Sequence, residues 1–180
     1  IVFLIGSTAS RAEMRQYTLT VGSGTAYDMS TGTTTIWLGG SGGGSRFFAF
    51  SGTKAIGFTF NLDAIGYTQF QVYTSGLITL GTDTLTTYTQ NNLAGYNKPL
   101  LAPFWDSLSM TGTQSGCVAP KVHYKVFGSA PNRVLVIEWK DLEVVYQKGA
   151  RGTVQARLYE DGKIEYYYAS MNNCATCGPL

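Results

Sequence analysis

The feature that most constrains this chain is a series of segments between residues 131 and 169 in which apolar and polar residues alternate. Residues 133–140 and 152–160 have the pattern of strands, and Asp161 and Gly162 separate the second of them from residues 163–169. Asp-Gly between two such segments is a strong hairpin signal, because both residue types tolerate the positive φ that a type I′ turn requires. The pattern predicts consecutive antiparallel strands, each with one face buried.

The same alternation recurs along most of the chain, and no segment carries a sustained helical period. The further strands that we expect are residues 15–21, 33–38, 55–61, 67–74, 76–81 and 121–127. A total of about ten strands is more than one sheet comfortably holds. The sequence therefore predicts an all-β fold, a two-sheet antiparallel β-sandwich with jelly-roll-like order.

Composition indicates a folded domain and excludes nucleic-acid binding. The chain has 180 residues, of which 44% are apolar, enough for one substantial core. Charged residues make up only 13%, and 13 basic against 11 acidic residues give a net charge of +2. Such a weak and dispersed charge does not neutralise phosphates, so we expect no nucleic-acid partner. We expect a single domain over residues 13–180, whose C-terminal end the sequence leaves open.

The first twelve residues form a separate segment. Ile1, Val2, Phe3, Leu4 and Ile5 are followed by small residues, as at the end of a signal peptide, with a cleavage site before Glu13. Five apolar residues are too few to span a bilayer, so no membrane span is expected. The alternative is an ordinary strand or an assembly strand, in which residues 1–5 pair with an open sheet edge of a neighbouring copy.

The three cysteines, Cys117, Cys174 and Cys177, favour a disulfide and an exported protein. A bridge from Cys117 to either of the others closes a long loop and contributes about 4 kcal/mol in the chain-entropy model. The alternative is that the C-x-x-C pair is a redox or zinc motif. The redox motif needs a following helix and zinc needs two further ligands, and neither is visible in the sequence.

Candidate catalytic groups are sparse. His123 is the only histidine and lies in mid-strand, where we expect it to face solvent. Asp106 and Glu138 would form a glycosidase pair only if the fold set them about 5–10 Å apart across a cleft. Asp83 and Asp106 lack the repeated acidic spacing of a calcium loop. The sequence therefore predicts no catalytic residues, no metal and no cofactor.

Aromatic residues divide into core and surface candidates. Trp105 and Trp139 lie in or beside apolar strands, where each would bury about 150–250 Å² as a core anchor. Trp37, Tyr88 and Tyr96 are the weak candidates for stacking on sugars, because they occur in or near polar segments.

Two loops complete the pattern. Residues 39–45 consist of glycine and serine, which predicts a flexible connection and not a phosphate cradle. Residues 82–98 are rich in Thr, Asn and Gln, and form the best candidate for a variable binding surface.

Five segments together resemble a known class of module. They are residues 56–61, 67–81, 101–106, 128–139 and 154–160. In their order they are similar to β-sandwich modules of large bacterial surface and secreted proteins, many of which leave the cell by type IX secretion. Residues 102–106 are also weakly similar to nidogen-like extracellular domains. The resemblance covers about residues 50–170 and implies an extracellular location, without catalytic residues to carry over.

These observations predict a non-catalytic extracellular surface module with a structural or adhesive role. One form of that role is a subunit of a cell-surface filament, assembled by strand addition with copies of itself as partners. The alternative is a carbohydrate-binding module attached to a secreted enzyme, with glycans as ligands.

Overall fold

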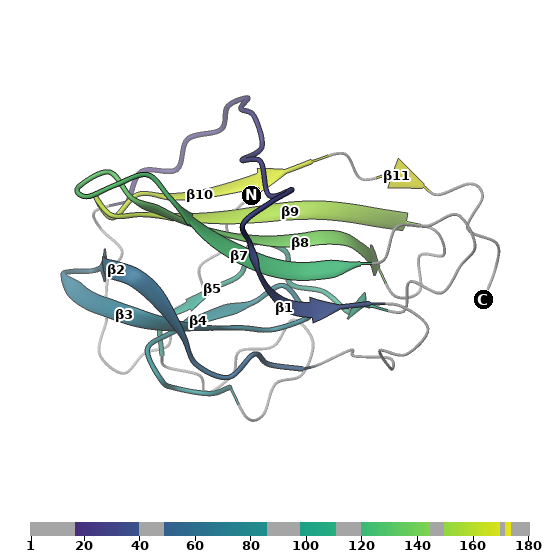
Figure 1. Ribbon diagram of the computed structural model, residues 1–180, viewed down its shortest axis with the longest axis horizontal. Coiled ribbons are helices and arrows are strands. Elements are labelled where there is room, and N and C mark those ends of the chain that lie inside the picture. Colours follow the sequence, from purple (N-terminus) through teal and green to yellow (C-terminus); the bar gives the residue numbers. More distant parts are fainter. Residues whose placement is uncertain are drawn as a thin grey trace.

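The computed structural model describes residues 17–39, 49–85, 98–110, 120–144, 150–169 and 172–173, which form two stacked β-sheets (Figure 1). None of these residues is helical, which confirms the all-β prediction. The strands are β1 (Thr34–Leu38), β2 (Lys54–Leu62), β3 (Ile65–Val72), β4 (Ile78–Leu80), β5 (Leu100–Leu101), β6 (Leu108–Ser109), β7 (Lys121–Phe127), β8 (Val134–Val144), β9 (Ala150–Tyr159), β10 (Ile164–Tyr168) and β11 (Asn172–Asn173).

The strand order confirms a two-sheet antiparallel sandwich. The larger sheet has the order β1-β7-β8-β9-β10, with β6 beside β8 and β11 beside β9, and the smaller sheet has the order β2-β3-β4-β5. Every pairing is antiparallel. Among the described strands, the chain changes sheet only after β1 and after β5, which is fewer crossings than a jelly roll makes.

Between the sheets lies one apolar core, to which alternate residues of the facing strands contribute. Trp139 is only 2% exposed at its centre, and its indole N–H donates a hydrogen bond to the backbone oxygen of Tyr73 at 3.0 Å. This bond satisfies the one polar atom of the ring. Trp139 is therefore a core anchor, as predicted. Trp105 is half-buried beside a smaller cluster that contains Tyr73 and Leu77.

The type I′ turn that was predicted at Asp161 and Gly162 is found instead between β2 and β3. The hairpin β9–β10 is present, but only Gly162 of its turn has positive φ, at 91°, and Tyr159 N–H bonds to Lys163 O at 2.9 Å. The connection is thus a three-residue loop that ends in a positive-φ glycine and not a type I′ turn. The type I′ pattern occurs between β2 and β3, where Asp63 and Ala64 have φ of 49° and 63°.

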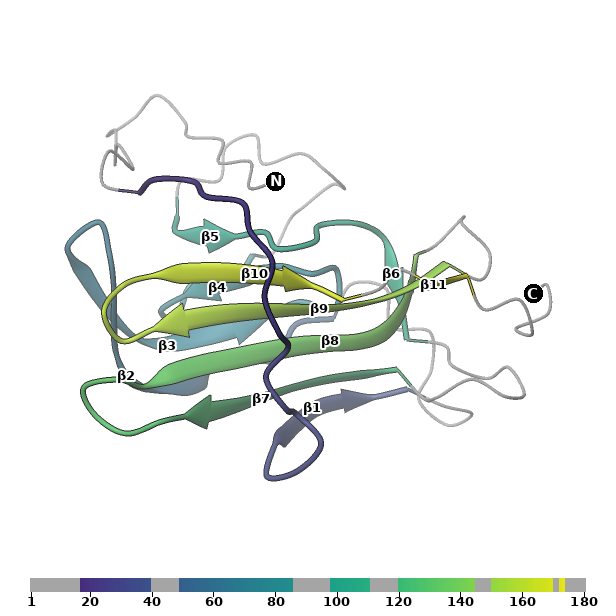
Figure 2. The same ribbon diagram turned by 90° about the horizontal axis from the view of Figure 1, so that it is seen from above.

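Strand β8 is buried on both faces, so the prediction of one buried face per strand is wrong there. All six residues 134–139 are buried. One face packs on the smaller sheet, and the other is covered by residues 17–33, which run across β10, β9, β8 and β7 before entering β1 (Figure 2). We call residues 17–33 the strap. Its residues 17–21 were predicted as part of a strand, but they pair with no described strand.

Candidate functional site

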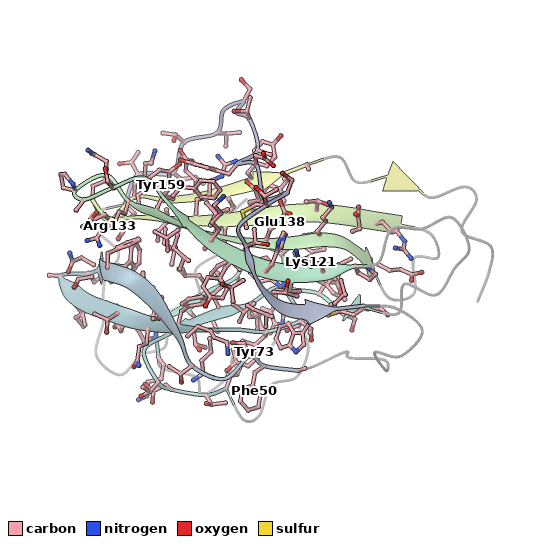
Figure 3. All side chains as sticks on the ribbon, in the orientation of Figure 1. Phe50, Tyr73, Lys121, Arg133, Glu138 and Tyr159 are labelled. Carbon is pink, nitrogen blue, oxygen red and sulfur yellow. The ribbon has the colours of Figure 1, made fainter. Side chains whose placement is uncertain are left out.

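The candidate site is a row of polar side chains on the outer face of the larger sheet, beneath the strap. His123 on β7 lies directly opposite Glu138 on β8, and Glu138 lies directly opposite Gln155 on β9. Opposite residues of paired strands point to the same face, so register alone brings these three side chains together. They are 1%, 6% and 0% exposed. Figure 3 shows Glu138 on the larger sheet, with Tyr73 and Phe50 at the smaller one.

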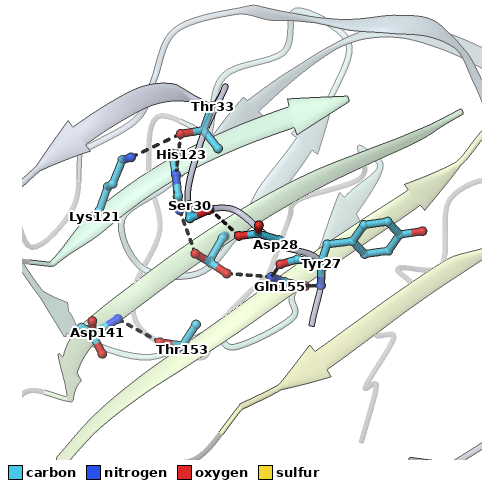
Figure 4. A network of polar contacts seen from close by, with 10 residues as sticks. Tyr27, Asp28, Ser30, Thr33, Lys121, His123, Asp141, Thr153 and Gln155 are labelled. Carbon is cyan, nitrogen blue, oxygen red and sulfur yellow. Dashed lines mark hydrogen bonds and ion pairs between the residues drawn. The ribbon is translucent and has the colours of Figure 1, made fainter. Parts of the chain in front are cut away.

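A continuous chain of hydrogen bonds links this row (Figure 4). His123 Nδ1 lies 2.9 Å from Thr33 Oγ1, and His123 Nε2 lies 2.8 Å from Glu138 Oε1. Gln155 Nε2 donates to Glu138 Oε2 at 2.7 Å. A carboxylate only accepts hydrogen bonds, so the imidazole proton belongs on Nε2. Each oxygen of Glu138 therefore accepts one hydrogen bond from a buried neighbour.

The same face binds the backbone of the strap. The amide group of Gln155 accepts from Tyr27 N–H at 3.0 Å and donates to Tyr27 O at 2.9 Å. Arg157 donates to Thr25 O at 2.6 Å, and Lys125 donates to Thr31 O at 3.0 Å. Side chains of the sheet thus bind backbone groups of the strap, which pairs with no described strand.

One apolar contact and one cation–π contact help to fix the position of the strap along the sheet. Met29 is 5% exposed and packs on Val134 and Val136 of β8. The guanidinium of Arg157 lies between two rings, 4.9 Å from the centroid of Tyr27 and 4.8 Å from that of Tyr167. Cation–π contacts of this kind strengthen when they are desolvated.

Beside Arg157, a carboxylate gathers three donors. Glu165 accepts hydrogen bonds from Tyr159 at 2.5 Å, from Lys163 at 3.0 Å and from Arg157 at 3.4 Å. Burial alone would raise the pKa of the Glu165 carboxyl, but these hydrogen bonds together lower it below its ordinary value. Burial, and then the bond to Glu165, raise the pKa of the Tyr159 hydroxyl. Both groups are held in the protonation states that keep this contact at neutral pH.

The order hydroxyl, imidazole, carboxylate in Thr33, His123 and Glu138 is also the order of a hydrolytic triad. A nucleophile of that kind must reach a substrate, whereas the imidazole is 1% exposed and both of its nitrogens already have partners. The Thr33 hydroxyl also accepts from Lys121 Nζ at 3.3 Å. The geometry is that of a clamp between the strap and the sheet.

The sequence interpretation of His123 as solvent-facing is wrong. The imidazole is on the outer face, as the strand phase indicated, but the strap buries that face. The carboxylate of Glu138 is bonded within the network, and that of Asp106 accepts from Ser107 N–H at 2.7 Å, so the two take part in separate contacts. The missed signal was the run of apolar residues 134–137, which is typical of a strand covered on both sides.

The predicted site residues fall in different places. Trp37 lies on β1, is half-buried and packs against the central core. The others lie outside the described residues: Tyr88, Tyr96, Cys117, Cys174, Cys177, the assembly strand Ile1–Ile5, and most of the two predicted loops, residues 39–45 and 82–98. The predictions for them stand as they were made.

Other features of the described residues set limits on the chemistry. A cavity lined by apolar groups, among them Trp139 and Leu142, has a volume of about 10 Å³, far below the few hundred Å³ of a ligand pocket. Within the described ranges, no three His, Cys, Asp or Glu side chains gather where they could hold a metal ion. Nor does this part of the chain contain a helix of the length and apolarity needed to cross a membrane.

Comparison with known proteins identifies the family. The model of the family described as NIDO related matches residues 16–178, nearly the whole chain. This chain is a member of the NIDO-related family. The match includes the strap as well as both sheets, so the NIDO-related domain extends well beyond the residues that showed the nidogen-like resemblance. No curated protein and no solved structure matches the chain.

Proposed function

We propose that this NIDO-related chain is a non-catalytic extracellular module with a structural or adhesive role. The observation that supports this proposal most is the use of its polar side chains. The buried groups best suited to chemistry are those of His123, Glu138, Gln155 and Arg157. His123, Gln155 and Arg157 bind the strap, and Glu138 binds His123 and Gln155. A face built this way stabilises a fold and leaves none of these four groups facing a substrate.

Location at the cell surface is part of the same proposal. Membership of the NIDO-related family supports it, because domains of this type are typically extracellular. The low content of charged residues, 13%, and the three cysteines agree with export. The proposal includes a bacterial origin and secretion by the type IX route, which the sequence resemblance supports. It also includes a disulfide, which the cysteine count supports. So does assembly into a filament by strand addition.

The test has a location arm and an adhesion arm. Native cells that produce the full chain with an epitope tag are treated with a membrane-impermeant biotin reagent, and beads coated with purified protein are then presented to the same cells. We expect the tagged chain to be biotinylated, and the beads to be retained above beads coated with albumin. A chain found only inside the cell would overturn the proposed location. The proposed structural or adhesive role would be overturned if these beads were retained no better than albumin-coated beads and if cells that lack the gene had an unchanged surface.

The carbohydrate-binding alternative predicts a different result. Sugar recognition needs exposed aromatic rings in a row, and among the described residues the exposed large aromatics are Phe50 and Tyr168, at 51% and 40%. Tyr168 also donates its hydroxyl proton to Pro103 O at 2.5 Å. Binding on a glycan array that disappears in Phe50→Ala would favour the alternative over the structural role.

A further inference from the structure

The peptide bond between Gly32 and Thr33 lies beside a hydroxyl group that is bonded to a buried base. Thr33 Oγ1, at the end of the strap, lies 2.9 Å from His123 Nδ1 (Figure 4). The Cβ, Cα and N atoms of Thr33 separate this oxygen from the carbonyl carbon of Gly32. Attack on that carbon closes a five-membered ring, so the reacting groups are already held together. Burial, which keeps an external substrate away from His123, is no obstacle to a reaction of the chain with itself.

The tautomer of His123 is the one that a general base needs. Its Nε2–H donates to Glu138 Oε1 at 2.8 Å, so Nδ1 carries the free lone pair. The Thr33 hydroxyl therefore donates its proton to Nδ1, which is the contact through which a base activates a hydroxyl nucleophile. When the imidazole takes up that proton, the carboxylate of Glu138 stabilises the positive charge, as the acidic member of a hydrolytic triad does.

Two ammonium groups lie near the atoms on which negative charge would develop. Lys121 Nζ lies 3.3 Å from Thr33 Oγ1, and Lys125 Nζ lies 3.0 Å from Thr31 O. A Cβ on Gly32 would lie 3.3 Å from Lys125 Nζ, so this cation is beside the residue whose carbonyl group is attacked. Positive groups held in place next to a reacting carbonyl stabilise the transition state for acyl transfer.

The other side of the same peptide bond is open to solvent. Gly32 is exposed and has φ of 66°, a conformation that favours glycine. It carries no side chain that could shield its carbonyl carbon, and water can reach it. The bond thus has a buried base on its Thr33 side and a water-accessible acyl group on its Gly32 side, which are the two requirements for forming an ester and then hydrolysing it.

We propose that the chain cleaves itself between Gly32 and Thr33. Thr33 Oγ1 attacks the carbonyl carbon of Gly32 while His123 Nδ1 takes up the hydroxyl proton. The C–N bond then breaks, the same proton passes to the Thr33 nitrogen, and an ester joins Gly32 to Thr33 Oγ1. Water hydrolyses this ester to a Gly32 carboxylate and a Thr33 hydroxyl, and the proton released is taken up by the new amino group of Thr33.

Cleavage changes the covalent connection of the strap and leaves its contacts in place. The piece that ends at Gly32 keeps its hydrogen bonds to Lys125, Gln155 and Arg157, and Met29 stays packed on β8. On the other side of the break, β1 remains paired with β7. We therefore expect the two pieces to stay together in the native protein. This inference goes beyond the proposed function, which concerns the role of the chain toward other molecules.

Mass spectrometry of the purified wild-type chain under denaturing conditions tests the cleavage. After incubation at neutral pH with protease inhibitors, we expect one piece that ends at Gly32 and one that begins at Thr33, which elute together in native size-exclusion chromatography. The reaction should be first-order and independent of protein concentration. Hydroxylamine, which attacks esters, should accelerate the cleavage and leave a hydroxamate on Gly32. A folded chain that stays intact with and without hydroxylamine would overturn the proposal.

Substitutions at the nucleophile distinguish self-cleavage from cutting by another protease. Thr33→Val keeps the shape of the side chain but lacks the hydroxyl, so cleavage should be abolished, whereas Thr33→Ser should still cleave. The matched control is Thr34→Val, the same change at the next residue, which is exposed and should leave the rate unchanged. Cleavage of Thr33→Val at the wild-type rate would overturn the proposal.

Glu138→Gln separates the base from the clamp. The new carboxamide nitrogen can donate to His123 Nε2, so the imidazole proton moves to Nδ1, and His123 can no longer take a proton from Thr33. General base catalysis contributes about 10²–10⁴-fold, so the cleavage rate should fall by about that factor while circular dichroism still shows a folded chain. An unchanged rate would overturn the role of His123. A chain that is surface-exposed and adhesive but never cleaved would retain the proposed function and overturn self-cleavage alone.

Discussion

Replacing Glu138 tests whether the polar network needs a negative charge or only a side chain that can form both hydrogen bonds. In Glu138→Ala, the Nε2–H of His123 and the Nε2–H of Gln155 lose their acceptor in a site where both side chains are nearly inaccessible. An unsatisfied buried donor costs about 1–3 kcal/mol, and this change leaves two of them. We expect Glu138→Ala to lower the free energy of unfolding by about 3–5 kcal/mol.

Glu138→Gln should behave differently, because His123 can change its tautomer. The new carboxamide can accept from Gln155 through its oxygen and donate to His123 Nε2 through its nitrogen. The imidazole proton then moves to Nδ1 and is donated to Thr33 Oγ1, which lies 2.9 Å away. The displaced Thr33 hydroxyl proton can turn to water, since Thr33 is half-buried. The donors of His123 and Gln155 stay paired, and of these groups only the second N–H of the new carboxamide gains no partner, so the cost should be about 1 kcal/mol.

The assay combines urea unfolding with nuclear magnetic resonance. With an m-value of about 2 kcal/mol/M, Glu138→Ala should lower the urea midpoint by about 1.5–2.5 M, and Glu138→Gln by about 0.5 M. Long-range ¹H–¹⁵N correlation of the imidazole reports the tautomer, and His123 is the only histidine in the chain. The matched control is Glu143→Gln, the same change at a half-buried site on the same strand. If Glu138→Gln is as unstable as Glu138→Ala, or keeps its proton on Nε2, the tautomer argument is refuted.

Three other features give measurable predictions. Ala64 has φ of 63° in the β2–β3 turn, so Ala64→Gly should raise the free energy of unfolding by about 0.5–1 kcal/mol in urea melts, and a loss would contradict the assigned strain. Gly76 has φ of 80°, and a Cβ there would lie 1.8 Å from Phe104 O, so Gly76→Ala should cost more than about 3 kcal/mol, seen as a lower midpoint or loss of soluble protein. Burial first, and then nearby acidic groups, raise the pKa of Tyr17 and Tyr159 above 10.0. A tyrosine whose pKa is raised by folding stabilises the fold below pH 10, and this contribution is lost as the pH rises through its pKa in the folded state. Urea midpoints should therefore fall between pH 9 and 11, and they should fall less in Tyr159→Phe.

The strands were predictable because alternation is a local signal. Residues 121–127 form a strand with the predicted bounds, and the hairpin around Gly162 is present. The form of its turn was not predictable from Asp-Gly alone, since the loop length decides between two and three residues. The β2–β3 turn consists of Asp63 and Ala64 and contains no glycine, the residue that usually marks a type I′ turn. The sequence therefore contained little indication of this turn.

The candidate site was harder to predict, because it depends on contacts far apart in the sequence. The phase of β7 placed His123 on the outer face correctly, but no local pattern shows that another segment covers that face. Glu138 and Gln155 become its neighbours only through strand register. Residues 17–21 of the strap alternate as in a strand, yet the strap pairs with no described strand, and side chains of the sheet bind its backbone. The sequence contained one usable sign, the unbroken apolar run at residues 134–137.

The long sequence separation between the strap and its sheet has a consequence during protein synthesis. Tyr27 and Gln155 are 128 residues apart. At about 5–20 residues per second, Tyr27 is translated roughly 6–25 s before the glutamine that will bind it. Strands β7 to β10 are sequential neighbours and can pair as soon as they are complete, whereas the strap must wait for all of them. On a polysome, the strap of each new chain therefore emerges among older chains whose larger sheets are closer to completion than its own.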